Sequence, residues 1–511
     1  MVSAELASVI RRRLADEVGR LDRDAPRRVA LCYPSPYAVG MSSLGYQRIY
    51  RAIQETPGYS CERVFLEDDG DRPGATLERP VSYENLRPLE NFDVIAFSVA
   101  YEIELAGLVR MLDAAGIFPE REKREDQLLL MGGPLTNSNP LPLSAFADAI
   151  VMGEGEEVVG WALETIAEAP GREEALSRLA RHPHIHVPAV HGAALPPIGA
   201  ADNALLPAHS TIITPHTELS GMFLTEVERG CSRGCTYCVM RRSTNGGMRI
   251  VPKEVVLETI PADARRVGLV GAAVSDHPTI VEIVNALADR GAEVGLSSLR
   301  PDKLRDDLIA ALKRVGYRTL TTALDGPSER MRGIIERRGR EPHFVAAAER
   351  AKQHGMDRLK LYLMIGLPGE TGEDIDECAR FVGELSRIVP IALGISPFCS
   401  KRNTPLDNMP YAGVARVQKR LERLRRGLQG RADVRATSAK WTWIEYVLAQ
   451  GGEAEGRAVA EAVRAGGRYA DFKRAFGGLG HKPDGAGYLD VEAPIAPERL
   501  KRRPPSAAIV R

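Results

Sequence analysis

The sequence lacks an excess of charge of either sign. Its 68 Lys and Arg residues balance 68 Asp and Glu residues, so the formal net charge is +0. A chain without a net field does not attract nucleic acid or an anionic membrane through its overall charge. Short basic runs occur at 11–13, 337–340 and 501–503. Their pattern predicts solvated helix faces or chain ends.

Long apolar runs are also missing. No stretch of about 18 apolar residues occurs, which excludes a membrane-spanning helix, and residues 1–20 carry charges throughout, unlike a signal segment. Seven cysteines, an odd number with three in one short segment, argue against a secreted disulfide framework. We therefore expect a cytoplasmic protein that makes no membrane contact. Its 511 residues have room for two or three domains.

Three of the cysteines form a compact motif. Cys231, Cys235 and Cys238 follow the spacing C-x3-C-x2-C, a glycine precedes each of the first two, and the aromatic Tyr237 precedes the third. Three thiolates on one loop can hold three irons of a cubane iron–sulfur cluster. The fourth iron then stays open to a substrate or cofactor, as in an open catalytic metal site. Zinc commonly takes four ligands in paired C-x2-C units, and no second pair is present.

This loop resembles the signature of the radical S-adenosylmethionine (SAM) enzymes. The resemblance implies that Cys231, Cys235 and Cys238 hold a 4Fe–4S cluster and that the open iron binds the amino and carboxylate groups of SAM. In that family, electron transfer cleaves the sulfonium bond, and the resulting 5′-deoxyadenosyl radical abstracts a hydrogen atom from the substrate. We therefore expect an electron donor such as flavodoxin or ferredoxin. The sequence indicates neither the substrate, small molecule or otherwise, nor a catalytic side chain.

Before the cysteine loop, short β-rich runs alternate with helical patterns. Strands are predicted at 28–33, 93–99, 127–131 and 148–152. This alternation predicts a parallel, doubly wound sheet, which binds ligands beyond the carboxyl ends of its strands. Glycine-rich turns near Gly40, Gly132 and Gly153 fall at such ends. Together these segments resemble the cobalamin-binding-type domain that precedes the barrel in one branch of the radical SAM superfamily.

The resemblance to cobalamin domains has a gap. Such domains often supply a histidine to cobalt from an Asp-x-His-x-x-Gly loop, but this chain has no such loop and no histidine before His182. The cofactor is therefore either bound without a histidine from the fold or has been lost. The alternating histidines at 182–186 lie near no carboxylate or cysteine, which favours a solvated linker strand over a metal site.

A second series of strands follows the linker. Strands are predicted at 222–228, 267–270, 293–296, 317–323, 359–364 and 389–395. Six β/α units fall short of the eight of a closed barrel and predict an open, partial one, with its chemistry at the carboxyl ends of the strands. The predicted fold class is α/β, with an N-terminal doubly wound Rossmann-like (cobalamin-binding-type) domain, a partial (β/α)6 radical SAM barrel and a small C-terminal helical region. The predicted boundaries are an N-terminal helix at 1–25, the Rossmann-like domain at 26–195, a linker at 196–218, the barrel at 219–410 and the helical region with a disordered tail at 411–511.

The resemblance also implies SAM contacts at the strand ends. Where the family carries a Gly-Gly-Glu-like element this chain has no glutamate, so backbone carbonyls at Gly271 or Ala272 would take the SAM amino group. Arg300 can bind the SAM carboxylate in a bidentate manner, Asp325 matches a ribose or amino-group contact, and Gly366 borders the adenine. The candidate cofactor-binding residues are Tyr237, Gly271, Ala272, Ser298, Arg300, Asp325 and Gly366.

Three functions stay open from the sequence. With cobalamin, the expected outcome is methyl transfer to an unactivated carbon. The exit segment of the barrel is also similar to that of methylthiotransferases, which modify tRNA or protein. Against this, the N-terminal region offers only Cys32 and Cys61, too few for the second three-cysteine cluster that methylthiolation needs, and no β-rich RNA-binding module follows, so nucleic acid is not expected as a partner. A non-catalytic iron–sulfur or corrinoid redox sensor is the third function, but a sensor does not need the strand-end pattern.

Overall fold

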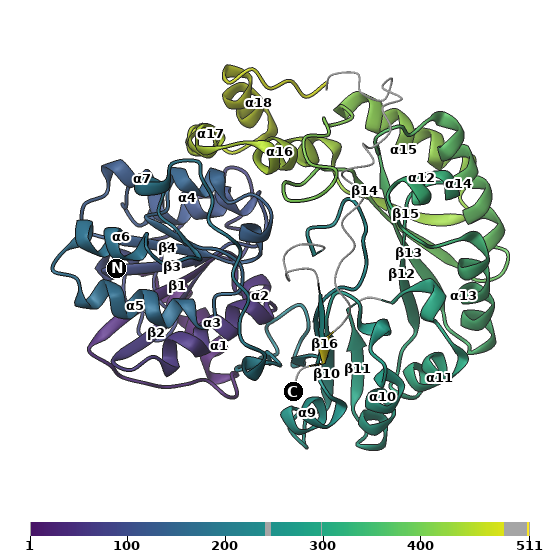
Figure 1. Ribbon diagram of the computed structural model, residues 1–511, viewed down its shortest axis with the longest axis horizontal. Helices are drawn as coiled ribbons and strands as arrows, with labels where there is room; N and C mark the ends of the chain where they lie inside the picture. The colour runs from purple at the N-terminus through teal and green to yellow at the C-terminus, as the bar shows by residue number, and fades with distance from the viewer. Residues whose placement is uncertain (1, 241–246, 298, 485–507, 510–511) are drawn as a thin grey trace. The chain divides into compact units, whose positions relative to one another are not determined.

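The structure is a computed structural model that describes residues 2–240, 247–297, 299–484 and 508–509 (Figure 1). The chain divides into two compact units. Unit 1 comprises Met1–Met222 and Val447–His481, and unit 2 comprises Phe223–Tyr446 and Lys482–Arg511. Among the described residues, no helix is long and apolar enough to cross a membrane.

Unit 1 is built on a six-stranded sheet with the strand order β2-β1-β3-β4-β5-β6. The first five strands are parallel, and β6 is antiparallel to β5. The strands are β1 (Arg27–Pro36), β2 (Tyr59–Leu66), β3 (Val94–Ser98), β4 (Leu128–Gly132), β5 (Ala149–Val151) and β6 (Ile185–His186). Helices lie on both sides of this sheet (Figure 1), which explains why every residue of β3 is buried. The predicted doubly wound domain is confirmed, and its topological switch point lies between β1 and β3.

The helices of the N-terminal part of unit 1 connect these strands. They are α1 (Ala4–Ala15), α2 (Tyr37–Gly40), α3 (Leu44–Glu55), α4 (Glu104–Ala114), α5 (Val158–Glu168), α6 (Arg172–Leu179) and α7 (Pro188–His191). The segment after α7 packs along unit 1, because Gly199 bridges Gly153 and Ile213 bridges Val18. The predicted solvated strand at 182–186 is wrong for His186, which is buried in β6.

Two helices from near the end of the chain complete unit 1. These are α17 (Glu453–Arg464) and α18 (Tyr469–Gly478). A Cβ atom at Gly456 would lie 2.1 Å from the carbonyl oxygen of Pro142, so only glycine lets α17 approach the 3-10 turn Leu141–Ala145 this closely. The guanidinium of Arg464 donates to the Asp113 carboxylate at 2.9 and 3.1 Å. Residues 453–478 therefore belong structurally to the sheet that the chain formed first.

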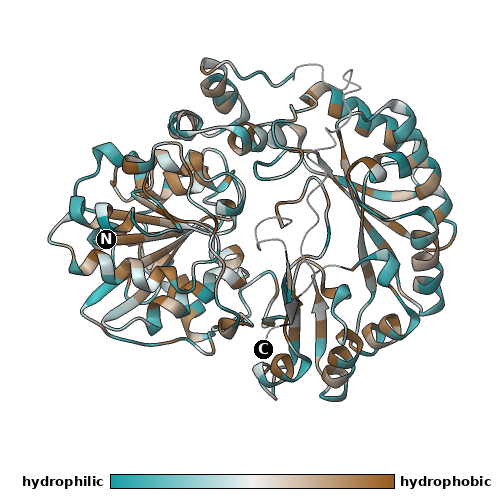
Figure 2. Cartoon of the chain, viewed as in Figure 1, coloured by the Kyte–Doolittle hydropathy of each residue, from teal (hydrophilic) through white to brown (hydrophobic). Residues whose placement is uncertain are grey.

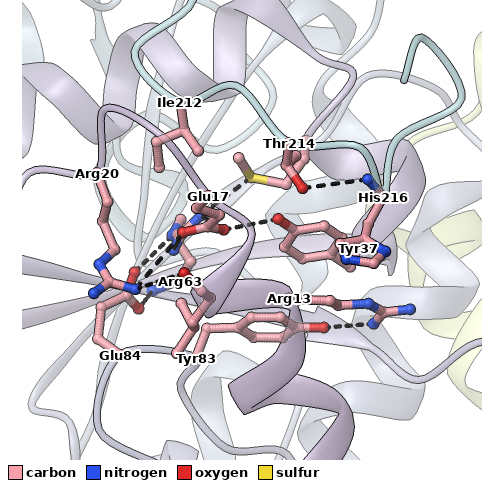
Figure 3. A network of polar contacts seen from close by, with 12 residues as sticks. Arg13, Glu17, Arg20, Tyr37, Arg63, Tyr83, Glu84, Ile212, Thr214 and His216 are labelled. Atoms are coloured by element: carbon pink, nitrogen blue, oxygen red, sulfur yellow. Dashed lines mark hydrogen bonds and ion pairs between the residues drawn. The ribbon is translucent and has the colours of Figure 1, made fainter. Parts of the chain in front are cut away.

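A buried arginine ties the core of unit 1 together (Figure 3). Arg63 donates to both oxygens of Glu17, at 2.7 and 2.8 Å, and its Nε donates to Glu84 at 2.6 Å. The hydroxyl of Tyr37 donates to Glu17 at 2.7 Å. Because a buried charge is costly unless it is paired, these two carboxylates are what permit Arg63 to lie inside the unit.

A second arginine extends the same network toward α1. Arg13 donates to the hydroxyl of Tyr83 at 2.8 Å and to Asp68 at 2.7 Å. The ring of Tyr83 stacks on that of Tyr37, with 5.0 Å between the ring centroids. The prediction that the run 11–13 is solvated is therefore wrong for Arg13, which is buried.

Unit 2 contains the parallel strands of the partial barrel. They form two sheets, with the orders β11-β10-β7 and β12-β13-β14-β15, and a single parallel bridge from Leu299 to Thr322 connects them. The strands are β7 (Phe223–Glu226), β10 (Arg266–Val270), β11 (Glu293–Leu296), β12 (Thr319–Asp325), β13 (Arg358–Ile365), β14 (Ile391–Pro397) and β15 (Ala432–Ala436). All six predicted strands are confirmed, and β15 is a further parallel strand that pairs with β14.

A small sheet flanks the cysteine loop, with one strand directly before the loop and one after it. Strand β8 (Glu228–Gly230) pairs antiparallel with β9 (Met248–Ile250), and β9 pairs parallel with β16 (Ala508–Ile509). Apart from β16, the tail that was predicted to be disordered lies outside the described residues from 485 onward.

Helices alternate with the barrel strands. They are α9 (Lys253–Thr259), α10 (Ile280–Asp289), α11 (Asp306–Arg314), α12 (Glu329–Ile334), α13 (Glu341–Gln353), α14 (Gly372–Leu385), α15 (Val414–Leu428) and α16 (Ala439–Gln450). Figure 2 shows hydrophobic residues concentrated on the strands, while the helices alternate between hydrophobic and hydrophilic residues. This pattern is the one expected when amphipathic helices cover a sheet.

Candidate functional site

The cysteine loop begins where β8 ends, at Gly230. The backbone N–H of Cys238 donates to the carbonyl of Cys235 at 3.2 Å, which tightens the loop. Thr236 fixes it from outside, because its N–H donates to the carbonyl of Ile335 at 3.1 Å and its own carbonyl accepts from the N–H of Leu406 at 3.2 Å. The loop is therefore anchored to the end of α12 and to the segment after β14.

The three cysteines are free thiols. Burial raises the pKa of Cys231 to about 11 and that of Cys238 to about 12, so in the absence of metal both are neutral. Metal binding would therefore release protons from them. The thiols lie close enough to influence one another electrostatically. Within the described ranges, no three His, Cys, Asp or Glu side chains already surround a common point. The donor set itself, three soft thiols, fits an iron–sulfur cluster.

Glu228 supports the strand end opposite the loop. Its buried Oε1 accepts the N–H of Ala273 at 2.7 Å. A Cβ atom at Gly271 would lie 2.2 Å from this oxygen, which explains the glycine there. Burial raises the pKa of Glu228 to about 7. Our sequence analysis missed this residue. Two features of the sequence could have indicated it, namely a glutamate just upstream of the cysteines and the absence of the glutamate from the Gly-Gly-Glu-like element.

The carbonyls proposed for the SAM amino group are partly engaged. The hydroxyl of Ser297 donates to the carbonyl of Gly271 at 2.7 Å. A carbonyl oxygen has two lone pairs, so SAM would share the Gly271 oxygen with Ser297. Ser298 lies outside the described residues, and the contacts of Gly271 and Ala272 with SAM stay predictions.

Arg300 is held between two carboxylates. Its guanidinium forms ion pairs with Asp276 and Asp302, and its backbone N–H donates to the hydroxyl of Ser275 at 3.0 Å. Asp276 also meets the cysteine loop, because it lies 3.8 Å from the guanidinium of Arg233. The structure thus places Arg300 near the loop, but binding of the SAM carboxylate would have to compete with these two ion pairs.

Asp325, Tyr237 and Cys235 come together around Arg337. The Nε of Arg337 lies 2.7 Å from Oδ2 of Asp325, at the carboxyl end of β12. Burial raises the pKa of Cys235 and the nearby charge of Arg337 lowers it, and burial likewise raises the pKa of Asp325 while Arg337 and Tyr237 lower it, so these four side chains lie within interaction distance. The run 337–340 was predicted to be solvated, which is wrong for Arg337, whose side chain is 16% exposed.

Gly366 follows the end of β13 with a φ of 78°, a value that favours glycine. Its N–H donates to the buried carboxylate of Glu370 at 2.9 Å. Leu367 and Met364 pack in the same apolar cluster as Tyr237. This strand end therefore lies beside the cysteine loop, as predicted for a residue near SAM, although the contact itself stays a prediction.

Two family models match this chain. The model described as "Radical SAM proteins, N-terminal" matches residues 45–188, and the model of the radical SAM superfamily matches residues 225–382, which include the cysteine loop and the ends of the first strands. The chain belongs to the radical SAM superfamily. Membership implies a 4Fe–4S cluster and SAM as cofactors and an external reductant.

This radical SAM protein has relatives with and without an assigned function. An uncharacterized protein of Methanocaldococcus jannaschii is 27% identical over 400 residues, 75% of this chain and 79% of that one. The ribosomal protein uS12 methylthiotransferase RimO of Geobacter sulfurreducens is 27% identical over 225 residues, 41% of this chain and 49% of that one.

A solved structure shares the fold. The cobalamin-dependent SAM radical enzyme OxsB with aqua-cobalamin bound matches with a TM-score of 0.50 at 11% identity, covering 71% of this chain and 53% of that one. The chain thus spans about half the length of OxsB. At this identity the likeness is one of fold.

Proposed function

We propose that this radical SAM enzyme transfers a methyl group from cobalamin to an unactivated carbon of its substrate. The observation that carries the proposal is the joint presence, in one chain, of the three-cysteine loop and a doubly wound sheet with a β1/β3 switch point. Such switch points bind large cofactors beyond the strand ends. The fold likeness to OxsB, a cobalamin-dependent enzyme, supports the same conclusion.

The residues at the switch point fit a cobalamin held without a histidine. Tyr101, just after β3, has 63% of its surface exposed. Below it, the buried carboxyl of Glu104 accepts the N–H groups of Ala100 at 2.6 Å and of Tyr101 at 3.3 Å. Burial raises the pKa of Glu104 to about 7. An exposed ring on a fixed loop can pack against the face of a corrin without coordinating its metal.

The glycines near the strand ends contribute less than expected. A Cβ atom at Gly153 would lie 2.5 Å from the carbonyl oxygen of Gly199, and one at Gly40 would lie 2.5 Å from the ring of Phe65. Packing within unit 1 therefore accounts for these two glycines. At Gly132 a Cβ atom would make only ordinary contacts, the shortest being 3.6 Å, so packing does not explain why this residue is a glycine. The loop at 98–104 is the better candidate for the cofactor surface.

Each of the proposed cofactors has a separate task. When bound, the cluster and SAM supply the hydrogen-abstracting radical, and cobalamin supplies the methyl group. Cys231, Cys235 and Cys238 hold the iron. Glu228 fixes the backbone at 271–273, and Ser297 orients the carbonyl of Gly271. Because these groups are held by hydrogen bonds before the cosubstrate arrives, they present a preorganised surface to SAM.

Methylthiolation is the alternative that the RimO relatives suggest. It needs a second cluster, for which the N-terminal region offers Cys32 and Cys61. Both are buried, Cys32 in β1 and Cys61 in the neighbouring edge strand β2. Iron ligation by these two thiols would require the sheet to open, so the structure favours methyl transfer over methylthiolation.

Cobalamin binding tests the proposal directly. Anaerobically reconstituted protein should retain cobalamin in near-equal amount through gel filtration, and the Co(II) form should show no nitrogen hyperfine splitting from an axial histidine in its spin-resonance spectrum. With SAM and a strong reductant it should release both 5′-deoxyadenosine and S-adenosylhomocysteine. Failure to retain cobalamin would refute methyl transfer while leaving the superfamily assignment intact.

A matched pair of variants locates the binding surface. Tyr101→Ala should lower cobalamin retention, because it removes the exposed ring at the carboxyl edge. Phe118→Ala is the control, since Phe118 is 58% exposed but lies in the loop that leads into β4, at the amino edge of the sheet. Equal retention by the two variants would exclude the 98–104 loop from the site.

A further inference from the structure

Asp325 has a backbone conformation that a non-glycine residue rarely adopts. Its φ is 61°, and it lies at the carboxyl end of β12 with only 9% of its surface exposed. Such strain costs of the order of 1–3 kcal/mol and persists where the surroundings fix the residue, often at functional sites. The strain therefore points to a role for the position of this carboxylate.

The partner of that carboxylate is Arg337, which is fixed from several sides. Its Nε pairs with Oδ2 of Asp325 at 2.7 Å, and one terminal nitrogen donates to the carbonyl of Ala323 at 3.4 Å. Its backbone N–H donates to the carbonyl of Arg332 at 2.8 Å, just beyond α12. A guanidinium held in this way cannot swing out to solvent without breaking the ion pair.

The chain brings Arg337 to Cys235 through the backbone. The bond from the Thr236 N–H to the Ile335 carbonyl, 3.1 Å long, joins the residue after Cys235 to the residue two before Arg337. The guanidinium then lies close enough to Cys235 for its charge to act on the thiol.

The other two cysteines have different neighbours. Glu228 and Asp276 act on Cys231, and Asp325 acts on both Cys238 and Cys235, whereas the charge of Arg337 acts on Cys235. The three thiols of the loop are therefore not equivalent, because a cation faces Cys235 in particular.

We propose that Arg337, oriented by Asp325, donates a hydrogen bond to the Cys235 thiolate and raises the reduction potential of the 4Fe–4S cluster. Reduction adds one electron from the external donor and breaks no bond, so the reduced cluster carries one more negative charge. A nearby cation and an N–H donor to sulfur stabilise that form more than the oxidised one. The inference rests on the three-cysteine cluster and is independent of cobalamin.

Asp325 then has a different task from the predicted contact with SAM. Its carboxylate would hold the guanidinium against the sulfur, as partners behind a metal ligand orient it in other sites. Its negative charge also offsets part of the charge of Arg337. The pair would thus set how easily the donor reduces the cluster and, in turn, how strong a reductant the cluster is toward SAM.

Potentiometric titration of the reconstituted full-length protein tests this without SAM or turnover. The signal of the reduced cluster in spin-resonance spectra gives the midpoint potential of each variant. Arg337→Gln should shift the potential downward at unchanged iron and sulfide content. Asp325→Asn should shift it upward, because the amide still accepts from Arg337 but no longer offsets its charge. Arg338→Gln, the same change at the exposed neighbour, should leave the potential where it is.

Opposite shifts of the two variants are the signature of the proposed electrostatic effect. A wild-type potential in Arg337→Gln, or shifts of both variants in the same direction, would overturn the proposal. If Arg337→Gln takes up no iron, Arg337→Lys is the deciding variant. It keeps the charge but lacks the planar guanidinium, so its potential should lie below that of the wild type. An unchanged potential in this variant would refute the role of the guanidinium. A wild-type chain that takes up no iron would refute the cluster itself.

Discussion

Arg63 in unit 1 is fully buried and Arg337 in unit 2 is partly buried, and both meet carboxylates. Arg63 meets two, Glu17 and Glu84, and three of its N–H bonds end on their oxygens. Arg337 meets one, Asp325, and the rest of its fork turns to a backbone carbonyl and to Cys235. A buried cation that is matched by two carboxylates stabilises a core. An arginine that is paired with only one carboxylate keeps N–H donors for another acceptor, such as a cysteine thiolate.

The largest effect should follow from removing the cysteines beside Arg337. Changing Cys231, Cys235 and Cys238 together to Ala should reduce iron from about four per chain to none. Circular dichroism should show that the fold is retained, because Arg63 and the sheet of unit 1 are untouched. Iron and sulfide analysis checks the result. A full cluster in the triple variant would refute the assignment and redirect attention to the remaining cysteines.

Removing Arg63 should lower the stability of the fold, whereas removing Arg337 should lower the reduction potential of the cluster. Arg63→Met removes the guanidinium that neutralises the carboxylates of Glu17 and Glu84, which should lower the free energy of unfolding by about 3–5 kcal/mol. Urea unfolding followed by circular dichroism measures it. Arg72→Met is the control, because the ion pair from Arg72 to Asp69 is exposed and should be worth at most about 1 kcal/mol. A loss in Arg63→Met as small as in the control would mean that the network is not needed.

Arg300 sharpens the comparison, since it meets two carboxylates, as Arg63 does, but lies near the loop. If it exchanges these partners for SAM, Arg300→Ala should weaken SAM binding by about 1.5–3 kcal/mol. Calorimetric titration of the anaerobic, cluster-loaded protein measures the affinity. Unchanged affinity would place Arg300 with Arg63 as a structural residue and remove it from the SAM site.

A buried carboxyl group without an ion pair should make the protein less stable as the pH rises, whereas a paired carboxylate makes it more stable. Burial raises the pKa of Glu104 to about 7 from an ordinary value near 4.5. Between these values the unfolded chain has already lost the proton that the folded chain keeps, so stability falls as pH rises toward 7 and then levels off. Glu104→Gln removes this loss, and its stability relative to the wild type should rise by about 2 kcal/mol between pH 5 and 8. Urea unfolding at several pH values checks this, and a difference that does not change with pH would contradict it.

The smallest effect is expected at the surface. Arg464 pairs with Asp113 and Glu120, but its side chain is 42% exposed. Arg464→Ala should lower the unfolding free energy by only about 0.5–1 kcal/mol. Measuring the unfolding in high salt gives a second check, because screening should abolish the difference between variant and wild type. A loss as large as that of Arg63→Met would show that α17 is held mainly by this contact.

Structural features that are set by residues close together along the chain can be predicted from the sequence. The cysteine loop is contiguous, and the six barrel strands are short apolar runs with helical patterns between them, so both are accessible to periodicity and spacing. Strand β15 was not predicted, although Ala-Asp-Val-Arg-Ala alternates apolar and charged residues as a half-exposed strand does. The run is short and has only one β-branched residue, and its place in the sheet comes from pairing with β14.

The sequence does not predict what depends on distant partners. Glu228 acts on Ala273, 45 residues away, and Arg337 looks like part of a solvated basic run until Asp325 and Cys235 are placed beside it. Arg13 is misjudged for the same reason, since Tyr83 is 70 residues away. The burial of a charge is decided by its partner, and a single sequence does not name that partner.

The return of α17 and α18 to unit 1 has a consequence for how the protein is made. During synthesis the ribosome releases the strands of the first sheet long before residues 447–481, because residues 223–446 intervene. Helix α17 covers part of the surface of α4 and of the turn Leu141–Ala145. That surface stays uncovered until residues 223–446 have been synthesised. The nascent first unit is therefore incomplete, with apolar surface uncovered, until most of the chain has emerged. Its folding should finish together with that of the second unit and not before it, which makes this surface a natural target for a chaperone.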